Sequence, residues 1–117
     1  MNIQKEFVSR AGKKLQHALD EFEIEVEGLI CADFGCNLGG FTDCLLQNGA
    51  EKIYSIDTSK NCLEWNLRNN QKIVVLEKTN AMHVTLPEEV DLIVSDVAWT
   101  KQEKILPAIK SNLKKMD

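Results

Sequence analysis

Apolar runs of four to seven residues alternate with longer amphipathic stretches along the chain, which has 117 residues. Four runs are rich in β-branched and other apolar residues and predict strands at residues 29–32, 52–56, 72–76 and 90–96. Apolar residues at helical spacing predict helices at residues 7–22, 41–48, 59–69 and 101–115. Because strands and helices alternate, we expect an α/β fold in which a parallel sheet carries helices on both faces.

Capping and breaker residues set the predicted boundaries. Ser9 is a candidate N-cap of the first helix, whose apolar face we expect to include Leu15 and Phe22. Acidic and apolar residues alternate over residues 21–28, which favours an exposed connector or an edge strand. Pro107 is expected to end or kink the last helix unless it lies in the first turn.

The chain is organised around the segment Ala32-Asp33-Phe34-Gly35-Cys36-Asn37-Leu38-Gly39-Gly40-Phe41-Thr42. An apolar strand leads into it, and Gly35 permits a sharp turn. Gly39 and Gly40 open the next helix without a side chain that would hold a ligand away from the backbone. A strand, a glycine turn and a helix in this order are typical of the nucleotide-binding unit of a Rossmann-like fold.

Acidic residues around this segment indicate which nucleotide it binds. Dinucleotide sites use Gly-x-Gly-x-x-Gly, whereas the order here is Asp-x-Gly-x-x-x-Gly-Gly. A carboxylate at Asp33 would repel a pyrophosphate and would suit S-adenosylmethionine, which carries an ammonium and a sulfonium. Asp57 ends the next strand 24 positions later, near the offset of about 20 at which an acidic residue binds ribose hydroxyls. S-adenosylmethionine is therefore the expected cofactor, with a dinucleotide or no cofactor as alternatives.

A third acidic residue and a lysine are candidates for catalysis. Asp96 ends the fourth predicted strand, so Asp33, Asp57 and Asp96 should lie at one edge of the sheet. Asp96 would hold substrate or a catalytic ammonium, or would instead cap the next helix. Lys14 lies in the first helix, which can pack against the same crevice. Its ammonium group would there stabilise a developing alkoxide. From the residues alone Lys13 fits this role equally well, and a solvent-facing charge is the alternative for each.

Composition limits the classes of partner. The formal net charge is −4, which argues against binding nucleic acid by charge alone. Residues 1–17 and 101–117 each carry a net charge of +3. Such a charge fits either contact with a polyanion or a helix face that is exposed to solvent. The four cysteines form no C-x-x-C pair and both histidines are isolated, so we expect reduced thiols, a cytoplasmic protein and no metal site. No signal peptide and no apolar run of roughly 20 residues is present, so we expect no membrane partner.

Six blocks, in order along most of residues 5–113, resemble a known family. They are Val8–Leu15, Asp33–Asp43, Gly49–Ala50, Glu77–Ala81, Ser95–Val97 and Ile105–Ala108. Together they resemble the TlyA-type rRNA methyltransferases, which are often labelled hemolysin A and belong to the FtsJ-like ribose methyltransferases. The resemblance implies an S-adenosylmethionine-dependent enzyme that methylates ribose 2′-hydroxyls of ribosomal RNA.

The resemblance also implies roles for individual residues. Lys14 and Asp96 fall on two members of the family's Lys-Asp-Lys-Glu catalytic set. The family's cofactor-binding positions fall on Asp33, Gly35, Cys36, Asn37, Gly39, Gly40, Phe41, Asp57 and Asn80. The sequence departs from the family pattern at Ala11, Asn37, Leu38, Met82 and Val97–Thr100, the last of these on the substrate side.

The chain is short for that family. We interpret residues 1–117 as one domain, with an N-terminal helix and connector at 1–28 and an incomplete Rossmann-like core at 29–117. We expect the family's N-terminal RNA-binding domain to be missing, together with the later strands that carry the second lysine and the glutamate. Two functions remain open: an rRNA ribose methyltransferase or its cofactor-binding part, and a non-catalytic relative that binds S-adenosylmethionine, protein or RNA. We expect little or no turnover from the chain alone, and self-association through a sheet edge left open after the fourth strand.

Overall fold

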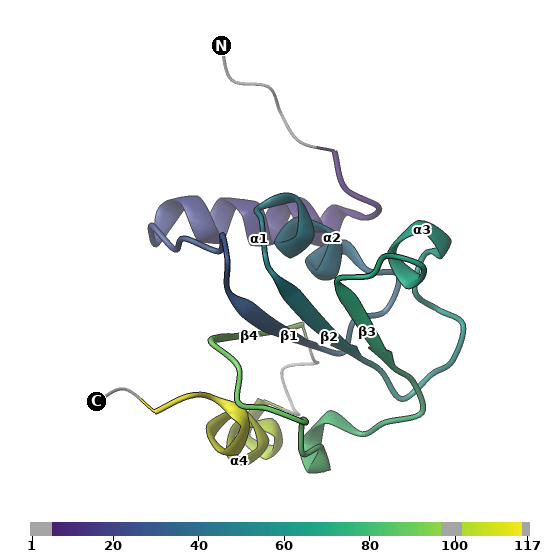
Figure 1. The fold of residues 1–117 in the computed structure, drawn as a ribbon, viewed down its shortest axis with the longest axis vertical. Coiled ribbons are helices and arrows are strands. Elements are labelled where there is room, and N and C mark those ends of the chain that lie inside the picture. The colour runs from purple at the N-terminus through teal and green to yellow at the C-terminus, as the bar shows by residue number, and fades with distance from the viewer. Residues whose placement is uncertain (1–5, 97–101, 116–117) are drawn as a thin grey trace.

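A parallel four-stranded sheet forms the centre of the computed structural model, which describes residues 6–96 and 102–115 (Figure 1). The strands are β1 (Ile30–Phe34), β2 (Lys52–Ile56), β3 (Ile73–Leu76) and β4 (Leu92–Ser95), in the spatial order β3-β2-β1-β4. The helices are α1 (Arg10–Glu21), α2 (Gly40–Gln47), α3 (Trp65–Arg68), the short 3-10 helix η1 (Ala81–His83) and α4 (Gln102–Asn112). Helices α1, α2 and α3 cover one face, and η1 and α4 cover the other, as predicted.

Alternation along the strands divides the interior into two apolar cores. Cys31 of β1 pairs with Ile53 of β2, and both side chains belong to the core beneath α1 and α2. The next pair, Ala32 and Tyr54, belongs to the core beneath α4. Strands that are buried on both faces read as nearly continuous apolar runs, which explains why the sequence predicts them well.

The register of the sheet brings the carboxyl ends of the strands to one edge. Asp33, near the end of β1, pairs with Ser55 of β2 and with Val94 of β4. Asp57 and Asp96 directly follow β2 and β4. The prediction that the three carboxylates lie at the same edge is therefore confirmed. Strands β3 and β4 are the outer strands of the described sheet, and self-association through an edge stays a prediction.

The helix predicted over residues 59–69 is much shorter in the structure, where α3 has four residues. Asn61 adopts a left-handed backbone conformation with φ of 60°, which a helix cannot accommodate. Glu64 then caps α3, because its side chain accepts hydrogen bonds from the amides of Asn66 and Leu67. The residues between β2 and Glu64 therefore form a loop beside the sheet edge.

The ends of the other elements differ in smaller ways. Helix α1 starts after Ser9, whose side chain makes no capping hydrogen bond, and stops before Phe22, which is 72% exposed instead of part of the apolar face. Residues 22–29 form a turn and a connector without a strand. Helix α4 continues through Pro107, so the proline does not end it.

Candidate functional site

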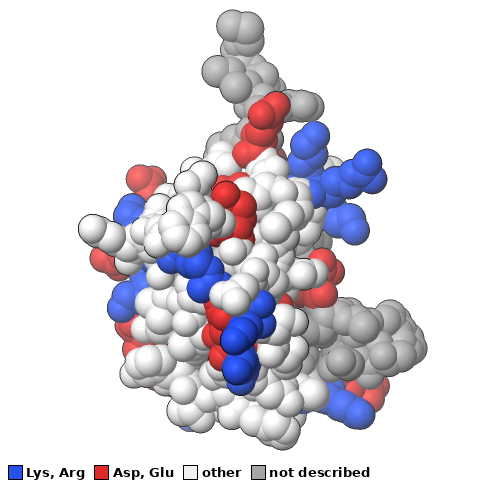
Figure 2. Space-filling view, turned by 90° about the vertical axis from the view of Figure 1, so that its right-hand side faces the viewer, with Lys and Arg blue, Asp and Glu red and all other residues white. Residues whose placement is uncertain are grey.

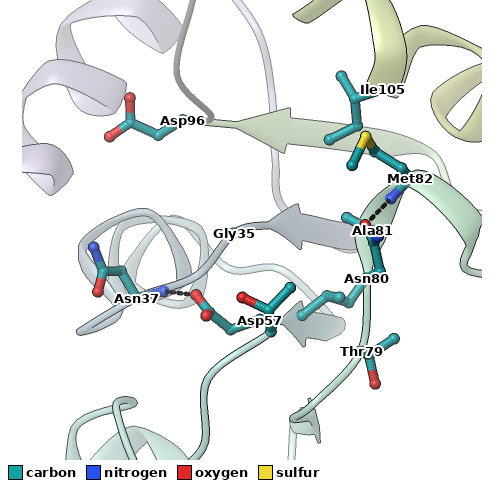
Figure 3. Close-up of a pocket in the computed structure, with 11 residues that line it drawn as sticks. Gly35, Asn37, Asp57, Thr79, Asn80, Ala81, Met82, Asp96 and Ile105 are labelled. Carbon is teal, nitrogen blue, oxygen red and sulfur yellow. Dashed lines mark hydrogen bonds between the residues drawn. The ribbon is translucent and has the colours of Figure 1, made fainter. Parts of the chain in front are cut away.

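Two adjoining pockets open at the carboxyl edge of the sheet. The larger has a volume of about 340 Å³ and is lined by Gly35, Asn37, Ile56, Asp57, Thr58, Thr79, Asn80, Ala81, Met82, Asp96 and Ile105 (Figure 3). The smaller has a volume of about 160 Å³ and is lined by Ser9, Ala11, Gly35, Cys36, Asn37, Leu38, Gly39, Gly40, Phe41 and Asp96. Three residues are common to both, so the pockets form two parts of one cleft.

The loop after β1 is fastened to β2 through three successive backbone amides. Gly35, which has φ of 88°, and Cys36 both donate to the carbonyl oxygen of Ile56, at 2.8 Å and 2.8 Å. Asn37 donates its amide to Asp57 Oδ2 at 2.8 Å (Figure 3). A phosphate-binding turn needs amides that point at the ligand, and these three are already engaged. The geometry therefore disfavours the dinucleotide alternative.

Asp57 presents a half-buried carboxylate to the larger pocket. Its Oδ2 accepts the amide of Asn37, and its Oδ1 accepts the amide of Ser59 at 2.9 Å. Each carboxylate oxygen has a second acceptor site, so both can still accept a hydroxyl from a ligand. Two backbone hydrogen bonds fix the carboxylate in the orientation that such a contact requires.

The far wall of the larger pocket comes from η1 and α4. The side chain of Asn80 caps η1 by accepting the amide of Met82 at 3.0 Å. Met82 and Ile105 belong to the same apolar core and lie together at one end of the pocket (Figure 3). Met82, Ile105 and Thr79 are pocket residues to which the sequence assigns no site role. Thr79 and Ile105 lie in the blocks that resemble the family and Met82 is a departure from its pattern, but the wall forms only when α4 packs against η1.

Asp33 lies beneath the cleft and lines neither pocket. Its side chain is fully buried, and Oδ2 accepts a hydrogen bond from Thr42 Oγ1 at 2.8 Å. Thr42 Oγ1 also lies 2.7 Å from Ser55 Oγ. Asp33 Oδ1 has no hydrogen-bond partner among the described residues. Burial raises the pKa of Asp33 to about 7, with the hydrogen bond from Thr42 opposing and the charges of Asp57 and Asp96 adding to the rise.

Gly39 and Gly40 line the smaller pocket together with Phe41, and packing within the protein requires both glycines. A Cβ on Gly39 would lie 2.5 Å from Leu67 Cδ1, and a Cβ on Gly40 would lie 2.0 Å from Ser9 Oγ. Protein atoms thus already occupy the space that we expected these glycines to leave for a ligand. Their backbone still forms the pocket wall, but the contact with α1 at Gly40, and at Gly39 the φ of 114° together with the contact with α3, explain why they are glycines.

The two candidate catalytic residues have different positions. Asp96 is exposed at the end of β4 and lines both pockets, which places it at the centre of the cleft. Lys13 and Lys14 are exposed on α1 and line neither pocket. Ala11 lines the smaller pocket one turn before Lys14, and long helical side chains lean toward the preceding turn. Residues 97–101, which hold the departure from the family pattern on the substrate side, lie outside the described residues.

The surface charge is mixed. Figure 2 shows acidic and basic side chains interspersed over the face that it presents, without one sign covering it. None of the helices in the described parts of the chain combines the length and the apolar character that crossing a bilayer requires.

Comparison with known proteins identifies the family. The model of the FtsJ-like methyltransferase family matches residues 7–116. Hemolysin A of Brachyspira hyodysenteriae is 44% identical over 115 residues, which are 95% of this chain and 48% of that protein. The 16S/23S rRNA (cytidine-2′-O)-methyltransferase TlyA of Mycobacterium tuberculosis is 42% identical over 110 residues, 91% of this chain and 41% of that enzyme. The chain thus spans somewhat less than half the length of these relatives.

A solved structure from Streptococcus thermophilus that carries a hemolysin name superposes with a TM-score of 0.89 at 34% identity, over 97% of this chain and 43% of that one. Solved S-adenosylmethionine-dependent methyltransferases share the fold at lower identity, which confirms the predicted Rossmann-like methyltransferase architecture. The sequence and the overall fold therefore both point to the same family. The chain belongs to the FtsJ-like methyltransferase family.

Proposed function

We propose that this chain is the S-adenosylmethionine-binding part of a methyltransferase that acts on ribose 2′-hydroxyls of ribosomal RNA. The family match and the relatives named as rRNA 2′-O-methyltransferases support the reaction class. The cleft supports the cofactor, because its volume of about 340 Å³ falls within the range of small-molecule sites. The substrate nucleoside that fits the named relatives best is a cytidine.

The observation that carries the cofactor assignment is the arrangement of the loop after β1. Its amides at Gly35, Cys36 and Asn37 are engaged by β2, whereas the carboxylate of Asp57 faces the pocket with free acceptor capacity. A site with committed donors and free acceptors suits the hydroxyls and positive charges of S-adenosylmethionine better than a pyrophosphate.

We assign the parts of the cofactor to the two pockets. In the larger pocket, Asp57 would accept the ribose hydroxyls, and Asn80 and the apolar wall would hold the base. In the smaller pocket, the loop from Gly35 to Asn37 and the start of α2, from Gly39 to Phe41, would hold the amino-acid part. The positive end of the α2 dipole favours its carboxylate. Buried Asp33 would act on its positive charges from below through the field, without direct contact.

The substrate side of the cleft is the side of Asp96 and α1. S-adenosylmethionine supplies an electrophilic methyl group when bound. Asp96 would orient the ribose hydroxyl, and Lys14, one turn from the pocket wall, would stabilise the oxygen as its proton leaves. Since ribosomal RNA is the proposed substrate, we also propose a cytoplasmic location.

Calorimetric titration with S-adenosylmethionine tests the cofactor assignment. The variant Asp57→Ala should weaken binding about tenfold to a hundredfold, because losing a hydrogen bond to a charged group costs about 1.5–3 kcal/mol. Glu51→Ala is the matched control, since Glu51 is an exposed acid at the opposite end of the same strand and should leave the affinity unchanged. Equal affinities for wild type and Asp57→Ala would refute the assignment.

Methyl transfer tests the catalytic assignment. Tritiated-methyl incorporation into unmodified rRNA should depend on Lys14 and Asp96, and Lys13→Ala serves as the neighbouring control. Loss of a proton-transfer group lowers turnover by about 100- to 10,000-fold. Because little turnover is expected from the chain alone, transfer is measured with the chain joined to the parts that the longer relatives carry. Tight cofactor binding without measurable transfer in that form would favour the alternative of a non-catalytic relative.

A further inference from the structure

Two cysteines and a carboxylate that are distant in sequence meet beside the cleft. Cys36 follows β1, Asp57 follows β2, and Cys62 lies in the loop before α3. Their ligand atoms, the two Sγ atoms and a carboxylate oxygen of Asp57, all lie within 4.8 Å of one another. Cys36 is 5% exposed, and Asp57 and Cys62 are half-buried, so the cluster is sheltered but reachable from solvent.

The loop that carries Cys62 is held in place from both sides. Ser59 donates its amide to Asp57 Oδ1 at 2.9 Å and accepts the amide of Lys78 at 3.2 Å. The amide of Asn61 donates to Glu77 Oε2 at 3.0 Å. Glu77 in turn forms an ion pair with Arg68 of α3. The cluster is therefore presented by a fixed loop, which is the condition for a preorganised binding site.

The electrostatics of the cluster favour a cation. Burial raises the pKa of the Cys36 thiol, and the charges of Asp33 and Asp57 raise it further. Burial and the charge of Asp57 also raise the pKa of Cys62, against a smaller opposing effect of Arg68, whose guanidinium already pairs with Glu77. A cation placed between the two sulfur atoms and the carboxylate would offset the negative charge that collects there.

We propose that Cys36, Asp57 and Cys62 form a binding site for a thiophilic divalent cation, with Zn²⁺ as the best fit. Thiolates and carboxylates are both zinc ligands, at about 2.3 Å and about 2.0–2.2 Å. Ligand atoms of a tetrahedral site are thus roughly 3.3–3.8 Å apart, so atoms now within 4.8 Å need to approach by only about an ångström. Each thiol binds as a thiolate, so one bound Zn²⁺ displaces one proton from Cys36 and one from Cys62. Three protein ligands leave a fourth position for water.

This site shares Asp57 with the larger pocket. If that carboxylate binds the cofactor ribose, as proposed above, zinc and S-adenosylmethionine compete for it. This consequence rests on the proposed function, whereas the metal site itself does not. Zinc would then inhibit cofactor binding without entering the part of the cleft lined by Asp96.

Cobalt substitution tests the metal site directly. Reduced, metal-free chain titrated with Co²⁺ without oxygen should develop a thiolate-to-cobalt charge-transfer band that saturates at one equivalent. The variant Cys62→Ser should lose about half of the band and at least tenfold in affinity, since even indirect metal contacts are worth about 10- to 100-fold. Cys31→Ala, which removes a buried thiol near the start of β1, should leave the band unchanged. No band, or a band that persists unaltered in Cys62→Ser, overturns the proposal.

Calorimetry tests the competition. Saturating Zn²⁺ should raise the apparent dissociation constant of S-adenosylmethionine at least tenfold for the wild type. Cys62 lines neither pocket, so Cys62→Ser should bind the cofactor like the wild type without zinc and should lose the zinc effect. Failure of S-adenosylmethionine to bind in the absence of zinc refutes the proposed function and leaves the cobalt result to decide the metal site. A cobalt band together with unchanged cofactor affinity in zinc overturns the shared use of Asp57.

Discussion

Asp33 carries an ionisable group where water cannot reach it. One oxygen accepts a hydrogen bond from Thr42, and the other has no partner among the described residues. Desolvation is the main reason why its pKa rises to about 7. An unpaired buried acceptor is costly, and this cost indicates that the position serves the site above it more than the stability of the chain.

The pKa of Asp33 predicts how stability depends on pH. In the unfolded chain an aspartate has a pKa of about 3.9, so between that value and about 7 the folded chain keeps a proton that the unfolded chain has lost. The contribution of Asp33 to stability therefore falls as pH rises from about 4 to about 7. Replacing Asp33 with the neutral residue asparagine removes this loss of stability with rising pH.

Urea unfolding of Asp33→Asn and wild type at several pH values measures the effect. The difference in free energy of unfolding should move in favour of the variant between pH 4 and pH 8, by on the order of 4 kcal/mol. Because only the change of this difference with pH is used, the contributions of the other carboxylates cancel. Any cost of the amide that does not depend on pH cancels as well. If the difference in free energy of unfolding stays constant over this pH range, the raised pKa of Asp33 is wrong.

At the scale of elements, the contact between α1 and α2 shapes the smaller pocket. The two helices approach closely at Gly12 and Gly40, where a Cβ on Gly12 would lie 2.9 Å from the carbonyl oxygen of Gly40. Asp43 of α2 holds the segment before α1 by accepting the amide of Val8 at 2.8 Å. Ser9 and Ala11 reach the pocket wall because of this contact. The glycine-rich segment thus positions the helix that carries Lys14.

Gly40→Ala should separate these helices. Its Cβ would meet Ser9 Oγ at 2.0 Å and the backbone nitrogen of Gly12 at 2.9 Å. We expect a loss of about 1–3 kcal/mol in stability and weaker binding of S-adenosylmethionine, measured by urea unfolding and calorimetry. Gly28→Ala is the control, since nothing lies within 4 Å of its Cβ and only its φ of +78° costs about 1–2 kcal/mol. If both variants retain wild-type affinity, the contact does not shape the pocket.

At the scale of the whole molecule, α4 closes the second face of the sheet. Its last residue, Asn112, accepts the amide of Val90 through its carbonyl at 2.9 Å, and Val90 accepts the amide of Lys114 at 2.9 Å. Lys114 also forms an ion pair with Asp91 at 3.1 Å. The end of α4 is thereby joined to the start of β4, and Ile105 is carried to the pocket.

Asn112 is the residue on which this closure depends most. Its buried side chain accepts the amide of Leu86 at 2.8 Å and donates to the carbonyl of Val84 at 2.9 Å. Asn112→Ala should cost about 2–4 kcal/mol, because these groups lose their partner inside the protein. Thermal and urea unfolding measure the loss. The exposed neighbour Ser111 is the control, and Ser111→Ala should change stability by less than about 0.5 kcal/mol. Similar losses for the two variants would show that α4 is not held through this side chain.

Local patterns were sufficient to predict much of the architecture. The strand predicted at residues 52–56 coincides with β2, and the other three predictions overlap their strands, because apolar alternation is a property of adjacent residues. Strand-terminal acids were also visible, and parallel strands necessarily bring Asp57 and Asp96 to one edge. The ordered motif blocks predicted the family, which the comparison confirms.

Only the tertiary structure decided what each side chain meets. The sequence could not show that Asp33 turns away from the cleft toward Thr42. Nor could it show that the start of α1 fills the space beside Gly40. The spacing of Cys36 and Cys62 did not indicate a shared site, yet the loop after β2 folds back and places their ligand atoms together. Spacing carries information about neighbours within one helix or strand, whereas contacts between distant segments depend on how the loops return the chain across the sheet edge.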